Sequence, residues 1–501
     1  MRTLLASILL IVAAPAAAQL VIQDREYDCR VIASTDQFPR GFPYGGPTMN
    51  AWGQLAFVVE QDPSRSYEIR VGRGDTFDGE PITSPLARAG GDGSLPSTFF
   101  SSFAFQPVIE SSGRLIFQAS DQPTGGPVGV GIYRVRTDHP VGTRPSTVYE
   151  NQSLNPQSPY VVFSTVFSPS TDSRGRVGFL AGTGAVNQGV FIDGALQAAN
   201  GQSSVVGIGG FWMDPGGQPF DALQLALTGG THVLRVGSST FETTTDVFTS
   251  SFTGVSLASN AVPILAYTRQ SFTPTTSWVL GINTGLGFAP YVDSNVDPFE
   301  FFAAPTSTSV NAWAEIAFLS SPDGDGETLL VADGDAVWRV LCANMQQIVG
   351  STVFFDYQLS TRALNSDGQI GFLAQTPQLV PGTGGFRTFV IRADPRPGQG
   401  GRPTSCSGLG DGTPCDDGDP ETLSSCSAGV CGGDPIGRPS DCTSLPDDTP
   451  CDDGVAGTFG YCSDQECVGV PVPEPPQTAA GMIAIASAML WRRARRLSAP
   501  S

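Results

Sequence analysis

Short apolar runs alternate with turns rich in Gly, Pro, Asn and Ser along most of the chain. Leu55–Val59 (LAFVV) is one such run, and a polar turn precedes it. Runs of roughly four to eight residues between turn residues are typical of β-strands. Gly and Pro make up about a fifth of the 501 residues, which disfavours long amphipathic helices. We therefore predict an all-β domain over residues 19–395.

A repeated frame, N-x-x-G-x-x-x-F, divides this domain into units. Two copies are clean, Asn50–Phe57 and Asn365–Phe372. In each, the Asn can accept a hydrogen bond from the backbone two residues on, the Gly can take a positive φ, and the Phe of the following apolar strand points into a core. Drifted copies occupy Glu110–Phe117, Asp172–Phe179, Asn260–Tyr267 and Asn311–Phe318, with a poorer seventh copy at Asp214–Asp221.

The frame recurs about every 40 to 60 residues, a spacing typical of propeller blades, so we predict a seven-bladed β-propeller. Residues 27–31 resemble the outgoing strand of a unit that has no start, so we expect this segment to complete the last blade. Cys29 and Cys342 lie in strand-like segments and form either a disulfide or a pair of buried thiols. A pair of twisted β-sandwiches is the alternative fold.

Cysteines concentrate beyond residue 405. A Pro- and Gly-rich linker, residues 396–405, precedes two modules at 406–435 and 442–471, whose cysteines repeat the same intervals of 9, 11 and 5 residues. Modules this small bury too little core to fold unaided, so we predict two disulfides in each, with three possible pairings. Zinc is disfavoured because both modules lack C-x-x-C and His. The cysteines are Cys406, Cys415, Cys426 and Cys431, then Cys442, Cys451, Cys462 and Cys467.

Residues 1–18 have the pattern of a signal peptide. Arg2 precedes the apolar run Leu4–Val12, and three alanines before Gln19 offer a cleavage site. An uncleaved anchor is the alternative.

The last thirty residues, 472–501, are patterned too. Val472, Pro473, Glu474 and Pro475 precede an apolar segment, residues 478–491, and the basic residues Arg492, Arg493, Arg495 and Arg496. This tail resembles the PEP-CTERM sorting signal of Gram-negative bacteria. The resemblance implies a short hydrophobic helix, transient anchoring in the inner membrane, and processing by an exosortase. The apolar segment is shorter than the roughly 20 residues of a spanning helix; an ordinary tail anchor is the alternative.

Composition and motifs limit the kinds of binding and catalysis that the chain can support. A net charge of −20 excludes non-specific nucleic-acid binding as a main role. Neither histidine, His139 or His232, has a catalytic context, and no catalytic residue or cofactor motif is found. Asp323, Asp325 and Glu327 alternate as calcium ligands do, although a solvated acidic turn has the same pattern.

The N-x-x-G-x-x-x-F frame resembles bacterial tandem-repeat surface proteins, and the modules are similar to the C-D-D-G cysteine repeats of large extracellular bacterial proteins. Together with the sorting tail, these resemblances imply a secreted protein of the cell surface or extracellular matrix. We expect a structural or ligand-binding role, associated with exopolysaccharide in a biofilm or with a surface protein as an adhesion module. An extracellular carbohydrate-active hydrolase or lyase is the alternative, since paired carboxylates on a propeller can cleave glycosides.

Overall fold

The computed structural model describes residues 22–471, apart from gaps that lie mostly in the connections between strands. The predicted signal peptide, and the sorting tail with its hydrophobic helix, lie outside the described residues. In the part of the chain that is described, no helix is long and apolar enough to cross a membrane.

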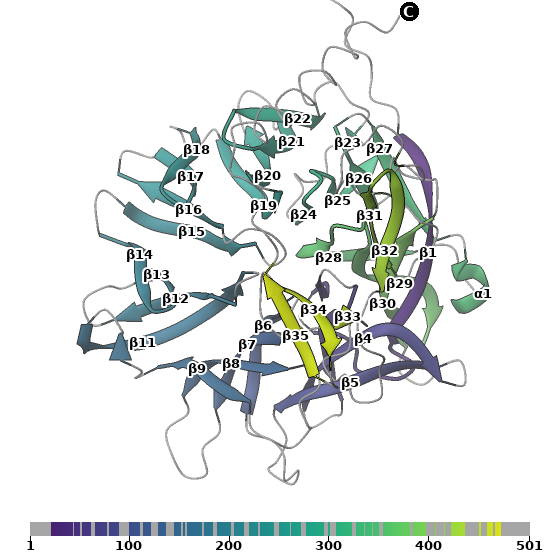
Figure 1. The fold of residues 1–501 in the computed structure, drawn as a ribbon, viewed down its shortest axis with the longest axis horizontal. Coiled ribbons are helices and arrows are strands. Elements are labelled where there is room, and N and C mark those ends of the chain that lie inside the picture. Colours follow the sequence, from purple (N-terminus) through teal and green to yellow (C-terminus); the bar gives the residue numbers. More distant parts are fainter. Residues whose placement is uncertain are drawn as a thin grey trace, which may run out of the picture.

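Seven four-stranded antiparallel blades stand around a central axis (Figure 1). From the innermost strand outward, blade 1 contains β2 (Thr48–Met49), β3 (Leu55–Glu60), β4 (Tyr67–Phe77) and β5 (Glu80–Ala89), and blade 2 contains β6 (Phe100–Ile109), β7 (Arg114–Asp121), β8 (Val130–Arg136) and β9 (Ser146–Glu150). Blade 3 contains β11 (Ser158–Thr171), β12 (Val177–Thr183), β13 (Gly189–Ile192) and β14 (Ala195–Ala199). Blade 4 contains β15 (Val205–Met213), β16 (Asp221–Leu227), β17 (Thr231–Val236) and β18 (Ser239–Thr244).

Blades 5 to 7 continue in the same order. Blade 5 contains β19 (Ser250–Asn260), β20 (Val262–Ser271), β21 (Ser277–Asn283) and β22 (Phe288–Asp293). Blade 6 contains β24 (Thr308–Val310), β25 (Ile316–Pro322), β26 (Thr328–Ala332) and β27 (Val337–Cys342). Blade 7 contains β28 (Phe355–Leu364), β29 (Ile370–Leu379), β30 (Phe386–Pro395) and β1 (Ile22–Ser34). Three short elements lie outside this pattern: β10 (Leu154–Asn155), β23 (Phe299–Glu300) and the helix α1 (Met345–Val349). The all-β propeller prediction is confirmed, and the sandwich alternative is wrong.

The N-terminal strand closes the ring. β1 is antiparallel to β30, with Tyr27 opposite Pro395, so it forms the outer strand of blade 7 as predicted. Its first residues also run parallel to β27 of blade 6, from Ile22 opposite Val337 onward. Cys29 and Cys342 join these two strands in a disulfide.

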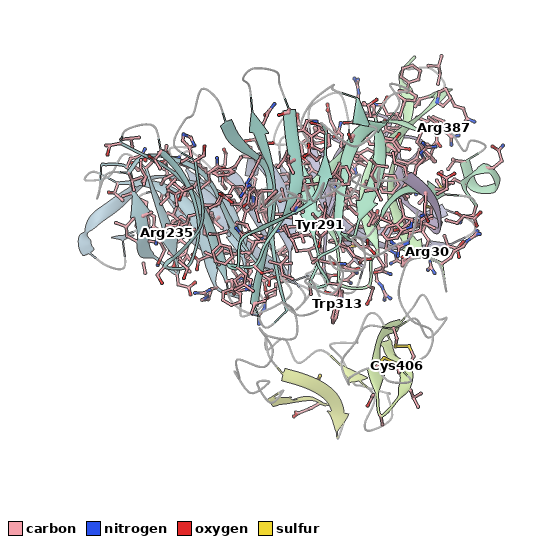
Figure 2. All side chains as sticks on the ribbon, turned by 90° about the horizontal axis from the view of Figure 1, so that it is seen from above. Arg30, Arg235, Tyr291, Trp313, Arg387 and Cys406 are labelled. Atoms are coloured by element: carbon pink, nitrogen blue, oxygen red, sulfur yellow. A yellow bond between two sulfur atoms is a disulfide. The ribbon has the colours of Figure 1, made fainter. Side chains whose placement is uncertain are left out.

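Each copy of the repeated frame forms the turn between the first and second strands of a blade. We call the side of the ring that carries these turns the repeat face, defined by Asn50, Glu110, Asp172, Asp214, Asn260, Asn311 and Asn365. In Figure 2, Trp313 lies on the side of the ring toward the module labelled at Cys406, and Arg387 lies on the other side.

The final aromatic residue of the frame packs into the apolar core between blades. Phe117, Phe179, Tyr267, Phe318 and Phe372 are buried, each in a hydrophobic cluster that contains residues of two neighbouring blades. The seventh copy is the exception, because Met213 pairs with Asp221 where Met49 pairs with Leu55. Its turn is two residues longer, so Leu223 and not Asp221 takes the core position.

The cysteine modules form small hairpins beyond the ring. In the first, β31 (Thr422–Ser427) pairs with β32 (Val430–Pro435). In the second, β33 (Pro450–Cys451), β34 (Thr458–Ser463) and β35 (Glu466–Pro471) pair in that order. Cys426 lies opposite Cys431, and Cys462 lies opposite Cys467, so the two hairpins share one register.

Candidate functional site

In four copies of the repeated frame, the side chain of the first residue organises the turn. The Oδ1 atoms of Asn50, Asn311 and Asn365 each accept a hydrogen bond of 3.0 Å from the backbone N–H four residues on. Asp172 accepts the equivalent bond from Arg176 at 2.9 Å. Asn311 and Asn365 also accept a bond of 3.0 Å from the backbone N–H two residues on, as predicted.

The same side chains connect neighbouring blades. Asn50 Nδ2 donates to the Glu110 carbonyl at 3.3 Å, and Asn311 Nδ2 donates to the Asn365 carbonyl at 3.1 Å. Thr171 Oγ1 donates to Glu110 Oε1 at 2.8 Å, and Ser259 donates to Asp214 Oδ2. The turns thus form a polar ring on the repeat face.

Hydroxyl groups on the innermost strands add a second set of links that our sequence analysis missed. Thr48 donates to the Pro107 carbonyl of blade 2 at 2.7 Å, and Ser309 Oγ accepts from two backbone N–H groups of blade 7 at 2.9 Å. Ser170 Oγ accepts from Met213 N of blade 4 at 3.1 Å. The sequence does contain a pattern that could have predicted these links, because Thr48, Ser170 and Ser309 each lie two residues before a copy of the frame.

Arg362 crosses the central axis. It projects from β28 of blade 7, and its Nη2 donates to Ser170 Oγ at 2.6 Å and to the Met213 carbonyl at 3.0 Å. Those acceptors belong to blades 3 and 4, which are the farthest from blade 7 in a ring of seven. Burial lowers the pKa of Arg362 to about 10, while Asp214, Glu110 and Asp172 favour its charged form. This side chain therefore joins opposite sides of the propeller near the repeat face.

The carboxylates around Arg362 are engaged in structural contacts. Glu110 accepts from Thr171, Asp172 accepts from Arg176 Nε at 2.6 Å, and Asp214 accepts from Ser259. Glycosidases use one carboxyl as acid and another as base or nucleophile across a sugar. The hydrogen bonds made by Glu110, Asp172 and Asp214 suit a role in holding turns and blades together.

Only one of the three candidate calcium ligands, Glu327, lies among the described residues. Asp323 and Asp325 lie outside the described residues. Glu327 is exposed just before β26, and partial burial together with the nearby Asp356 raises the pKa of its carboxyl. A calcium site here stays a prediction.

The first cysteine module contains two disulfides. Cys406 bonds to Cys426 and Cys415 to Cys431, with Cα separations of 5.4 and 5.8 Å. The sulfurs of Cys406, Cys415 and Cys431 lie within 4.8 Å of one another, but oxidised sulfurs are not the thiolates that zinc requires. In the second module, Cys467 is disulfide-bonded, and Cys442 lies outside the described residues. The sorting-motif residues, 472–475 and 492–496, also lie outside.

Comparison with known proteins finds similarity in fold only. No protein-family model matches the chain, and no curated protein matches it. The chain is similar to the WD40 β-propeller domain of Doa1, with 10% identity over 73% of this chain and 97% of that one, and a TM-score of 0.36. It is also similar to the β-propeller domain of the Trilobed protease from Pyrococcus furiosus (10% identity, 68% and 91% coverage, TM-score 0.39) and to the Neurospora crassa Pan2 WD40 domain (9%, 76% and 99%, 0.38).

Proposed function

We propose that this protein is exported to the cell surface or extracellular matrix, where the propeller is a structural or ligand-binding head on a disulfide-bonded stalk. The observation that carries the proposal is the position of the two ends of the propeller. β1 begins at Ile22 and β30 ends at Pro395, and both ends lie at the repeat face because Tyr27 pairs with Pro395. A stalk that leaves from this face at blade 7 holds the ring away from an anchor and keeps its surface accessible.

The disulfides support an oxidising compartment. One disulfide closes the ring, two lie in the first module, and Cys467 of the second module is also disulfide-bonded. Such bonds persist in secreted proteins and are rare where cytosolic thiol systems act. The expected partners are an exosortase and the secretion machinery during delivery, and extracellular polysaccharide or a surface protein afterwards.

Fractionation of the host tests the delivery part of the proposal. We expect the full chain in the surface or matrix fraction, and a chain lacking residues 472–501 in the medium. Retention of both in the cytoplasm would overturn it.

Binding is tested with the mature protein on immobilised exopolysaccharide from the host. We expect retention without release of sugars. A run with calcium and then with a chelator shows whether the acidic turn at Asp323, Asp325 and Glu327 takes part. Sugar release would instead support the hydrolase or lyase alternative, and no retention would leave a surface protein as the partner to test.

A further inference from the structure

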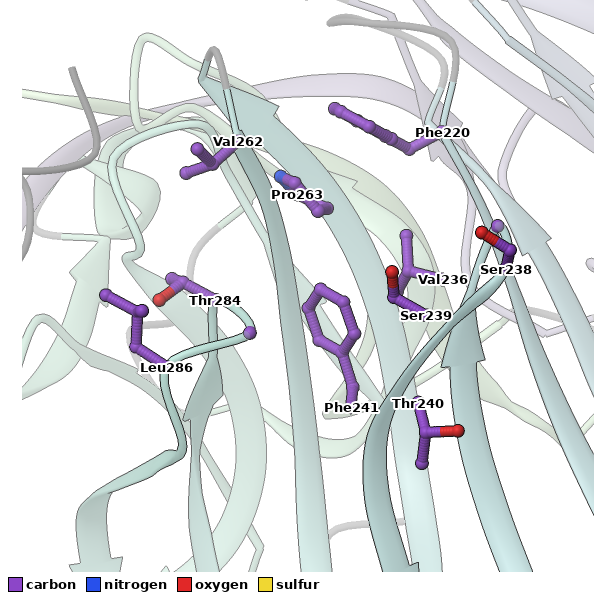
Figure 3. Close-up of a pocket in the computed structure, with 12 residues that line it drawn as sticks. Phe220, Val236, Ser238, Ser239, Thr240, Phe241, Val262, Pro263, Thr284 and Leu286 are labelled. Atoms are coloured by element: carbon purple, nitrogen blue, oxygen red, sulfur yellow. The ribbon is translucent and has the colours of Figure 1, made fainter. Parts of the chain in front are cut away.

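A pocket of about 490 Å³ opens between blades 4 and 5 at the repeat face (Figure 3). Its walls are the β17–β18 turn, the β21–β22 turn and the start of β20. Phe241 points into the pocket toward Pro263, and Leu286 stands at the edge with 69% of its surface exposed. Pockets of this size hold small ligands.

The lining combines two kinds of surface. Val236, Phe241 and Pro263 supply apolar walls, and four hydroxyl side chains stand around them: Ser238, Ser239, Thr240 and Thr284. Among the described residues that line the pocket, none carries a charge. This lining matches a neutral ligand that has an apolar face and a hydroxylated edge.

A buried amide holds the walls in place. Asn283 is 1% exposed, and its Nδ2 donates to the Phe241 carbonyl of blade 4 at 2.8 Å. Its Oδ1 accepts from Gly285 N at 2.8 Å, which fixes the β21–β22 turn. A Cβ on Gly285 would lie 3.4 Å from the Phe241 ring, so the turn packs closely on that ring. The pocket is therefore formed before any ligand arrives, which reduces the entropy lost on binding.

We propose that this pocket binds a sugar unit of a neutral glycan. A pyranose ring presents C–H groups on one face, which pack on an aromatic ring, and hydroxyls around its edge, which bond to Ser and Thr. A charged sugar or an acidic peptide would meet no opposite charge on the described part of the lining. The inference deepens the proposed function, because it names the ligand class of the binding head and the place where it sits.

The test is calorimetric titration of the full secreted chain with glucose, galactose and mannose, with their neutral tetrasaccharides, and with polygalacturonate as the acidic comparison. We expect saturable binding of a neutral sugar and none of polygalacturonate. Phe241→Ala should weaken binding about five- to tenfold through loss of the aromatic contact. Leu286→Glu should weaken it about three- to tenfold, because a hydrated carboxylate replaces the apolar side chain at the edge of the pocket. Leu379→Glu is the matched control, since Leu379 is 58% exposed at the end of β29 away from the repeat face.

Each outcome separates this inference from the proposed function. No saturable binding of any neutral sugar, or equal binding by wild type and Leu286→Glu, overturns the pocket assignment. Retention on host exopolysaccharide that survives Leu286→Glu also overturns it, while the proposed function stands. Sugar binding that Leu286→Glu weakens, in a protein that host exopolysaccharide does not retain, supports the pocket and contradicts the matrix-binding role.

Discussion

Gly53 shows how a turn residue is constrained by a distant part of the chain. Its φ is +70°, and a Cβ there would lie 2.5 Å from Gln369 Oε1 and 3.1 Å from Arg392 Nη1. Arg392 Nη1 donates to the Gly53 carbonyl at 3.2 Å, and its other nitrogens bind Asp394. The glycine is needed for its positive φ and also for the close approach of blade 7.

We expect Gly53→Ala to lower the free energy of unfolding more than Gly384→Ala. Gly384 has nearly the same φ, +69°, but nothing lies within 4 Å of its Cβ position. Both changes cost about 1–2 kcal/mol for the left-handed backbone, and Gly53→Ala adds about 1–3 kcal/mol for overpacking. Urea unfolding measures the difference. Equal losses would show that the Gln369 side chain moves aside freely.

Tyr357 predicts a loss of stability in alkali. Burial raises the pKa of Tyr357 to about 12 from its usual 10.0, with Glu327 adding to the shift and Arg339 opposing it. Above pH 10 the unfolded chain loses this proton while the folded protein keeps it, so the stabilisation present below pH 10 is lost as the pH rises toward 12. Tyr357→Phe should flatten the fall in unfolding free energy over this window. An unchanged slope would contradict the assignment.

At the scale of elements, the innermost strands hold neighbouring blades together through side-chain hydrogen bonds. Ser360 Oγ on β28 donates to the Pro47 carbonyl of blade 1 at 2.6 Å, and Ser309 on β24 accepts from β28. β28 thus bonds to both neighbouring blades, and its Arg362 reaches the opposite side of the ring.

Arg362→Met should lower the free energy of unfolding by about 3–5 kcal/mol, because it removes the charged donor bonded to Ser170 and to the carbonyls of Thr171 and Met213. Arg387→Met is the control. Arg387 pairs with Asp36 on the surface, where both side chains stay partly exposed, so its loss should cost at most about 1 kcal/mol. Chemical denaturation of both variants measures the two losses of unfolding free energy. Similar losses would show that Arg362 does not stabilise the ring more than a surface ion pair does.

The second cysteine module should repeat the pairing of the first. Both hairpins place two cysteines opposite each other, and in the first module each bonds instead to a cysteine upstream. We expect Cys442–Cys462 and Cys451–Cys467 bonds, to be identified by non-reducing proteolysis and mass spectrometry. The first module serves as the internal reference, and a Cys462–Cys467 bond would contradict the prediction.

For the whole molecule, closure of the ring depends on its N-terminal strand. The Cys29–Cys342 disulfide spans 313 residues of sequence, and Asn344 both donates to the Cys29 carbonyl at 2.8 Å and accepts from Cys29 N at 2.9 Å. These contacts hold β1 to blade 6, while its ladder with β30 completes blade 7.

Replacing Cys29 and Cys342 with Ser should destabilise the propeller by about 5 kcal/mol, since a long loop is released in the unfolded chain. Thermal unfolding measures the change, and hydrogen exchange in β1 should rise with it. The matched change at Cys406 and Cys426 should leave unfolding of the propeller unaltered. Equal effects of the two pairs would mean that module and propeller unfold as one unit.

The sequence by itself predicted a propeller of repeated units, the turn at each repeat and the closing role of β1, because these depend on local turn chemistry and on the alternation of apolar strands. It also located the cysteine modules, whose equal intervals are visible without a structure. Only the tertiary structure decided that Leu223 replaces Asp221 in the core, that Arg362 crosses the axis, and that blades 4 and 5 enclose a pocket. Those features come from residues that are far apart in sequence and make contact only after the blades pack and the ring closes.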